Sequence, residues 1–140
     1  MKARVKWTEA RRFIWGSGSG HRVIIDASAT PQGETRFGPS PMEMLLPGIC
    51  GRTVSRIIAI LNKMRPLVED VVFELKAVRT DSPQRVFTKI HALFSITGDI
   101  PLEKAKEAMS LTTDKSCSAG RMLAEIAEIT DKIKVIARKS

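Results

Sequence analysis

The sequence has 140 residues, 43% of them hydrophobic, and a formal net charge of +8 from 23 Lys and Arg against 15 Asp and Glu. This length predicts a single domain, residues 1–140, with its own hydrophobic core. No apolar run approaches the ~18 to 20 residues that a membrane span requires, and the charged start is unlike a signal peptide, so we expect a cytoplasmic protein without a membrane partner. The basic cations are scattered, Tyr is absent and aromatic residues make up 5%, which argues against nucleic acid as a partner.

The N-terminal part predicts a small three-stranded sheet. Apolar and basic residues alternate from Lys2 to Trp7, as in a half-buried strand, and Phe13 to Trp15 and Arg22 to Asp26 predict two more strands. The bend Gly16 to Gly20 has the composition of a phosphate loop. Because neither Lys-Ser/Thr nor a long helix follows it, we interpret it as a hairpin turn.

A long central helix is predicted next. Ser40 to Glu43 reads Ser-Pro-Met-Glu, which is a capping box with Pro at the first helical position. The uncharged stretch Met44 to Gly51 and the apolar residues up to about Arg65 predict a helix buried on most sides. Pro47 lies inside this stretch, so we expect a kink or a local break near Cys50.

The remaining chain predicts a long hairpin, two shorter helices and a last strand. The hairpin strands are Val71 to Val78 and Val86 to Ile96, the helices cover Leu102 to Met109 and Ala119 to Ala127, and the strand runs from Ile133 to Ala137. The order βββ-α-ββ-αα-β predicts an α+β fold rich in antiparallel pairing.

The two cysteines are the first candidates for chemistry. In a reducing compartment Cys50 and Cys117 are apolar fillers, metal ligands or reactive thiols. Cys117 stands at a predicted helix start, where the backbone N–H groups favour a thiolate, whereas Cys50 in a helix interior needs a nearby cation or polar network that the fold supplies. Together with His21 and His91 they could make four zinc ligands, but their wide spacing is unlike that of structural zinc sites.

Glu43 and several arginines are the candidate partners of a thiolate. Glu43 precedes Cys50 by seven residues, close to two helical turns, so it could orient an arginine beside the sulfur and still close the capping box. The candidate cations are Arg22, Arg36, Arg52 and Arg121. On a helix Arg52 points away from Cys50, while Arg121 shares a face with Cys117.

Three segments, Gly38 to Leu46, Gly48 to Gly51 and Asp114 to Ser118, resemble the signature stretches of the OsmC/Ohr family, the osmotically induced and organic hydroperoxide resistance proteins. The resemblance covers nearly the whole chain, including the order of the elements and the places of both cysteines. It implies an α+β fold with an N-terminal three-stranded sheet, a buried central helix and a long hairpin. It also implies an intertwined homodimer with its two sites at the interface.

The resemblance further implies a thiol peroxidase for organic hydroperoxides or hydrogen peroxide. Cys50 would match the peroxidatic cysteine and Cys117 the resolving cysteine, with an external dithiol or small thiol as reductant. Glu43 would match the glutamate that holds an activating arginine; because Thr35-Arg36-Phe37 resembles a family stretch, Arg36 is the first choice and Arg22 the second. We expect no cofactor and no metal.

The sequence departs from the family pattern in Ser118, where Pro is usual, and this variant is similar to a less characterised OsmC-like branch. Pro47 is unusual for the family as well. The alternative hypothesis is a non-catalytic or weakly catalytic dimer whose interface cleft binds a small anionic thiol or acyl compound.

Overall fold

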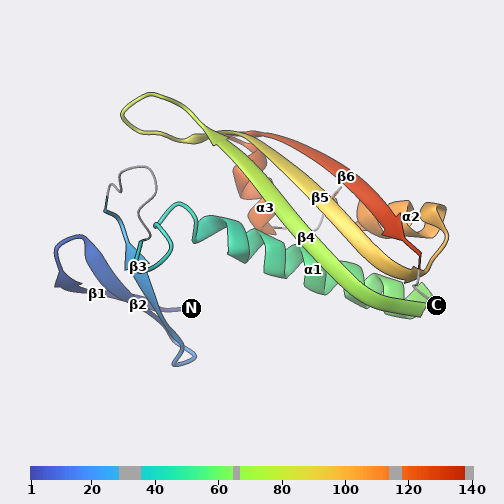
Figure 1. Cartoon of the computed structure of the whole chain (residues 1–140), viewed down its shortest axis with the longest axis horizontal. Coiled ribbons are helices and arrows are strands. Elements are labelled where there is room, and N and C mark those ends of the chain that lie inside the picture. Colours follow the sequence, from blue (N-terminus) through green and yellow to red (C-terminus); the bar gives the residue numbers. More distant parts are fainter. Residues whose placement is uncertain (29–35, 65–66, 114–117, 138–140) are drawn as a thin grey trace. The chain divides into compact units, whose positions relative to one another are not determined.

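The computed structural model describes residues 1–28, 36–64, 67–113 and 118–137, with the backbone alone at 113 and 118–120. The chain divides into two compact units, Met1–Pro47 and Gly48–Ser140, and Figure 1 shows their helices and strands. The single domain that the length predicts stays a prediction. In the described part of the chain no helix combines the length and the apolar character needed to cross a membrane.

The first unit is the predicted three-stranded sheet. Strands β1 (Ala3–Glu9), β2 (Arg12–Ser17) and β3 (Arg22–Asp26) pair antiparallel in the order β1-β2-β3. The glycine-rich bend is the hairpin turn between β2 and β3, as predicted: the Ser17 N–H donates to the His21 carbonyl at 3.0 Å and the Gly20 N–H to the Ser17 carbonyl at 3.1 Å. Gly20 has a φ of 89°, a conformation that glycine adopts without a steric penalty.

A buried carboxylate ties the end of β3 to the following loop. Asp26 is 2% exposed and accepts the Ser28 N–H at 2.9 Å and the Phe37 N–H at 3.2 Å. The Nε of Arg12 lies 3.8 Å from the same carboxylate, and the Arg12 guanidinium stacks 3.7 Å from the centre of the Phe37 ring. The hydrogen bonds from Ser28, more than the charge of Arg12, hold the pKa of Asp26 below its ordinary value.

The capping box forms as predicted, but the helix starts later than it predicts. The Glu43 N–H donates to Ser40 Oγ at 3.2 Å, and Glu43 Oε2 accepts the Ser40 N–H at 2.7 Å. Residues 41–44 nevertheless form a turn, and helix α1 spans Leu45–Met64. Pro47 explains the delay, because it has no N–H to donate to the Glu43 carbonyl; that carbonyl instead accepts the Leu46 N–H at 3.2 Å.

The predicted break near Cys50 is wrong. Pro47 is the third residue of α1, where an N–H needs no partner within the helix, so α1 continues without interruption to Met64 (Figure 1). The prediction that this helix is buried on most sides is also wrong for the single chain. The buried residues of α1 form one stripe, Thr53, Ile57 and Leu61, and Ile58 is 38% exposed.

The second unit is a three-stranded sheet with the order β4-β5-β6. Strands β4 (Leu67–Arg79) and β5 (Phe87–Asp99) form the predicted long antiparallel hairpin, and β6 (Glu128–Ile136) pairs parallel to β5. The two predicted shorter helices, α2 (Leu102–Thr113) and α3 (Ser118–Ala124), follow β5 and precede β6 along the chain. This is the α+β element order that the sequence predicts, with one parallel pair at the edge.

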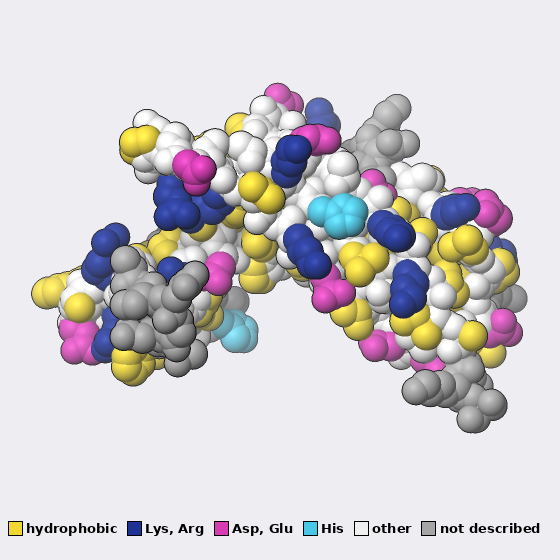
Figure 2. Space-filling view, turned by 45° about the horizontal axis from the view of Figure 1, so that its top comes forward, with side chains coloured by type: hydrophobic (Ala, Val, Ile, Leu, Met, Phe, Trp, Pro, Cys, Tyr) yellow, Lys and Arg dark blue, Asp and Glu magenta, His cyan; other side chains and the backbone are white. Residues whose placement is uncertain are grey.

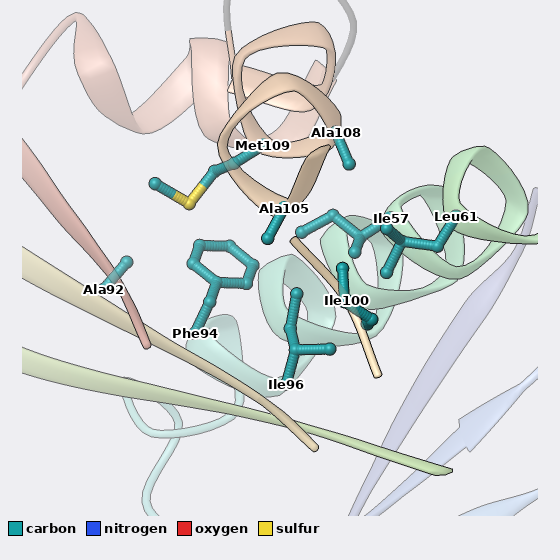
Figure 3. Packing of buried hydrophobic residues seen from close by; sticks show 9 residues of the cluster. All are labelled: Ile57, Leu61, Ala92, Phe94, Ile96, Ile100, Ala105, Ala108 and Met109. Carbon is teal, nitrogen blue, oxygen red and sulfur yellow. The ribbon is translucent and has the colours of Figure 1, made fainter. Parts of the chain in front are cut away.

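The core of the second unit lies between one face of this sheet and the helices. Figure 3 shows Ile57 and Leu61 of α1 converging with residues of α2 and with Phe94 and Ile96 of β5. Alternate residues of β5 are buried from Ile90 to Ile96, as the period of two predicts, so His91, Leu93 and Ser95 lie on the opposite sheet face. In the face shown in Figure 2 the described Lys and Arg side chains are interspersed with acidic and apolar ones.

Candidate functional site

Cys50 is the sixth residue of α1 and is half-buried as a free thiol. It precedes Thr53 by three positions and Ile57 by seven, so it lies on the helix face that carries the buried stripe. Burial raises the pKa of the Cys50 thiol above its ordinary value, and a backbone hydrogen bond only partly opposes this effect. Among the described residues, therefore, the effect of burial on the Cys50 thiol outweighs that of the backbone hydrogen bond.

Cys117 and its neighbours Asp114 to Ser116 lie outside the described residues. The described part of helix α3 runs from Ser118 to Ala124. The pairing of Cys50 with Cys117 stays a prediction.

An apolar cavity of about 240 Å³ lies in the second unit, and it is lined by neighbours of Cys50 in α1 but not by Cys50 itself. Ile49 and Thr53, which flank Cys50 in α1, both line it. The sheet contributes two stacked rings, Phe73 and Phe94, with centroids 4.1 Å apart. The other lining residues are Leu75, Ile90, Ala92, Thr112, Arg121, Leu123, Ala124, Ile129 and Asp131. An enclosure of this size and lining suits a small apolar group, since about 150 Å³ is enough for benzene.

The same cavity is bordered by the helix that follows Cys117. Arg121 and Leu123 of α3 line it, together with Thr112 near the end of α2. The Thr112 hydroxyl donates to the Ala108 carbonyl at 2.7 Å, so this buried polar group is satisfied. The elements that carry or follow the two cysteines thus meet at one apolar space.

In the first unit Arg36 and Glu43 form an ion pair. Arg36 Nη1 lies 3.3 Å from Glu43 Oε2, and Arg36 Nε donates to the Ser28 carbonyl at 3.2 Å. The pKa of Glu43 is lowered from its ordinary value. The main cause is hydrogen bonding from Ser40, and the charge of Arg36 contributes less. Glu43 is therefore ionised at neutral pH and holds the Arg36 guanidinium.

The other residues predicted as partners of a thiolate lie elsewhere in the fold. Glu43 precedes the start of α1, so the argument that two helical turns bring it onto the Cys50 face is wrong. Arg22 is exposed on β3 and Arg52 is exposed on α1, and neither pairs with Glu43 in the described part of the chain. Arg121 lines the cavity.

Sequence reasoning missed the polar residues of the cavity, Thr53, Thr112 and Asp131. For Thr53 a signal existed, because it follows Cys50 by three positions on a helix. For Thr112 and Asp131 only the tertiary fold brings them there. Among the described residues, His, Cys, Asp and Glu do not gather in any group of three or more that could hold a metal ion, and His91 instead shares a hydrogen bond of 2.8 Å with Thr130.

A family model described as OsmC-like protein matches residues 31–131. The chain belongs to the OsmC-like family. Protein YhfA of Escherichia coli K12 is 35% identical over 138 residues, which are 98% of this chain and 99% of YhfA. Among solved structures, an OsmC-like protein from Mycoplasma pneumoniae has a TM-score of 0.82 at 15% identity, with 96% of each chain covered. An organic hydroperoxide resistance protein OsmC from Legionella pneumophila has a TM-score of 0.71 at 17% identity, also with 96% of each chain covered. At these identities the two structures show the OsmC-like fold, which confirms the predicted fold class.

Proposed function

We propose that this OsmC-like protein is a thiol-dependent peroxidase that reduces organic hydroperoxides or hydrogen peroxide. The observation that carries the proposal is that Ile49, the residue before Cys50, and Thr53, three positions after it in α1, both line an apolar cavity. The apolar tail of a hydroperoxide would occupy the cavity while its O–O bond meets the sulfur. Membership of a family in which some proteins are named for hydroperoxide resistance supports the same chemistry.

The proposed cycle has three balanced steps. The Cys50 thiolate attacks the outer peroxide oxygen, the O–O bond breaks, and the leaving alkoxide takes a proton to become the alcohol while the sulfur becomes a sulfenic acid. The Cys117 thiol then attacks this sulfur, forming a disulfide and releasing water. An external dithiol reduces the disulfide to two thiols and is itself oxidised to a disulfide.

Arg36 and Glu43 are the proposed activating pair. Burial alone raises the pKa of Cys50, so a peroxidase that acts at neutral pH needs a positive charge near the sulfur. Arg36 is preorganised for that role by Glu43 and by the Ser28 carbonyl, which fix its guanidinium from two sides. Glu43 is a positioning residue in this scheme, and Arg36 is the group that would contact the thiolate.

We also propose the intertwined homodimer in a cytoplasmic setting, where thiols stay reduced between turnovers. The single chain leaves large apolar side chains uncovered on the first unit: Val5 is 58% exposed and Trp7 is 63% exposed. Ile58 of α1 is exposed as well. A second copy would cover such surfaces, because apolar area of this kind is stabilised by removal from water.

Thiol counting tests the proposal. One equivalent of cumene hydroperoxide should remove both free thiols from the reduced protein, and dithiothreitol should restore both. Cys50→Ser should keep its remaining thiol. Its matched partner Cys117→Ser should instead form a Cys50 sulfenic acid that dimedone traps. Persistence of both thiols in the unmodified protein under these conditions would exclude the peroxidase.

The second candidate function is binding of a small anionic thiol or acyl compound without turnover. Arg121 favours it, because this cation borders the apolar cavity and would suit an apolar tail with an acidic end. A carboxylate such as octanoate should then raise the melting temperature of the protein while peroxide leaves the thiols intact.

A further inference from the structure

The N-terminal sheet has two unlike faces, and one of them carries basic residues in neighbouring positions. Arg4, Gly16 and Arg22 stand side by side on β1, β2 and β3, because Arg4 pairs with Gly16 and Gly16 with Arg22. Directly paired residues of antiparallel strands share a face, so both arginines rise from the same side of the sheet. Lys6 lies two residues after Arg4 and joins them on that side.

Gly16 opens a hollow between the two arginines. The hollow has a volume of about 420 Å³, and its lining includes Arg4, Lys6, Gly16, His21 and Arg22. A Cβ atom at Gly16 would meet only the carbonyls of Arg4 and His21, both at 3.9 Å, which is ordinary contact distance. The backbone therefore does not require glycine here, and its absent side chain leaves the floor of the hollow free.

The charges in this hollow are not neutralised by the described carboxylates. Arg12, on the same sheet, pairs with Glu9 at 2.6 Å and Asp26 at 3.8 Å. Within the described residues none of Arg4, Lys6 and Arg22 has a carboxylate within 4.0 Å. Neighbouring strands of the sheet lie about 4.8 Å apart, so the three positive charges on β1 and β3 are close together. A bound anion would reduce the repulsion between them.

The hairpin turn adds hydroxyl and imidazole groups at the edge of the hollow. Ser17 Oγ and Ser19 Oγ lie 2.7 Å apart, and Ser19 Oγ lies 3.0 Å from His21 Nδ1. This chain of hydrogen bonds fixes the His21 ring and leaves its Nε2 for a ligand. Ser17 and His21 both line the hollow.

We propose that this hollow is a binding site for a small anion that carries a phosphate or pyrophosphate group. Two guanidinium groups can each form paired hydrogen bonds with phosphate oxygens, and Lys6 adds a point charge. The glycine-rich turn does not act as a phosphate loop, since it leads into a strand. It shapes the edge of a site whose charge comes from the strands. A concave site of this size suits a compact anion, whereas duplex nucleic acid would need an extended basic track.

Calorimetric titration of the full chain with inorganic pyrophosphate at low ionic strength tests the site. We expect saturable binding of one pyrophosphate per chain, weakened about tenfold or more by Arg4→Gln or Arg22→Gln, since each removes a charge-assisted contact. Arg11→Gln is the matched control, because it removes the same charge from the turn between β1 and β2, outside the hollow. It should change the affinity less than about twofold.

Gly16→Val separates a shaped site from diffuse attraction, because it keeps every charge and fills the floor. It should abolish binding while the melting temperature stays equal or rises, since a β-branched residue suits a strand. Absence of saturable binding would overturn the proposal. So would equal weakening by Arg11→Gln, or unchanged binding in Gly16→Val, because either would show a diffuse attraction such as short duplex DNA also experiences.

Discussion

Filling the cavity that Ile49 and Thr53 line should change which peroxides the proposed peroxidase reduces. Ala124, the last residue of α3, lines the cavity but is itself exposed, so the larger side chain of Ala124→Phe can enter without a buried clash. A phenyl ring there would take up much of the 240 Å³. The tail of an organic hydroperoxide would lose its place, whereas hydrogen peroxide has no tail to lose.

The size of the effect follows from the apolar area involved. Burying a group of the size of a Phe side chain contributes roughly 1.5 to 3 kcal/mol. Each ~1.4 kcal/mol is a factor of ten in a rate constant, so the tail contributes about tenfold to a hundredfold to kcat/KM. Ala124→Phe should lower the ratio of kcat/KM for cumene hydroperoxide to kcat/KM for hydrogen peroxide by a factor in that range.

The assay measures both peroxides with the same protein and dithiothreitol as reductant. Ala124→Ser is the matched control, because it changes polarity without filling the cavity, and its ratio should stay close to that of the unmodified protein. If Ala124→Phe lowers both values of kcat/KM in proportion, or lowers neither, the cavity does not hold the tail and the reasoning is refuted.

Four further predictions follow from individual contacts. Arg36→Gln should raise the pH midpoint of Cys50 alkylation by iodoacetamide, because the effect of burial on the pKa is then no longer offset by the guanidinium charge; an unchanged midpoint would remove Arg36 from the site. Ser40→Ala should cost about 1 kcal/mol of unfolding free energy in urea through loss of the capping hydrogen bond, and no loss would contradict that role. Leu61→Ala, at a fully buried position, should cost about 2 to 5 kcal/mol, whereas Ile58→Ala should cost clearly less unless a partner covers it. Because the pKa of Asp26 is lowered in the folded protein, its stabilisation is present above the unfolded pKa and lost as the pH falls through the folded value; Asp26→Asn should flatten this acid-side loss in urea titrations at several pH values.

The sequence predicted strands well where apolar and polar residues alternate along the segment. Arg22 to Asp26 has the predicted bounds, and the long hairpin lies where its period of two indicates. The last strand begins at Glu128, five residues before the predicted Ile133. Its first half is polar, and its extended form depends on pairing with β5, which sequence patterns do not reveal.

The ion pair of the candidate site could be predicted from the sequence, but the start of α1 and the apolar cavity could not. The Arg36–Glu43 contact joins two residues that the family resemblance had already linked. The delayed start of α1 comes from one missing N–H at Pro47, whose effect falls four residues upstream, on the Glu43 carbonyl. The apolar cavity could not be predicted, because three helices, α1, α2 and α3, and three strands border it and only the fold brings them together.

Intact-mass spectrometry of the reduced protein after one equivalent of cumene hydroperoxide tests the central claim most directly. The peroxidase account predicts a loss of two hydrogens and a disulfide-linked peptide pair that contains Cys50 and Cys117. An unchanged mass, or a Cys50 carrying added oxygen beside a free Cys117 thiol, would contradict it.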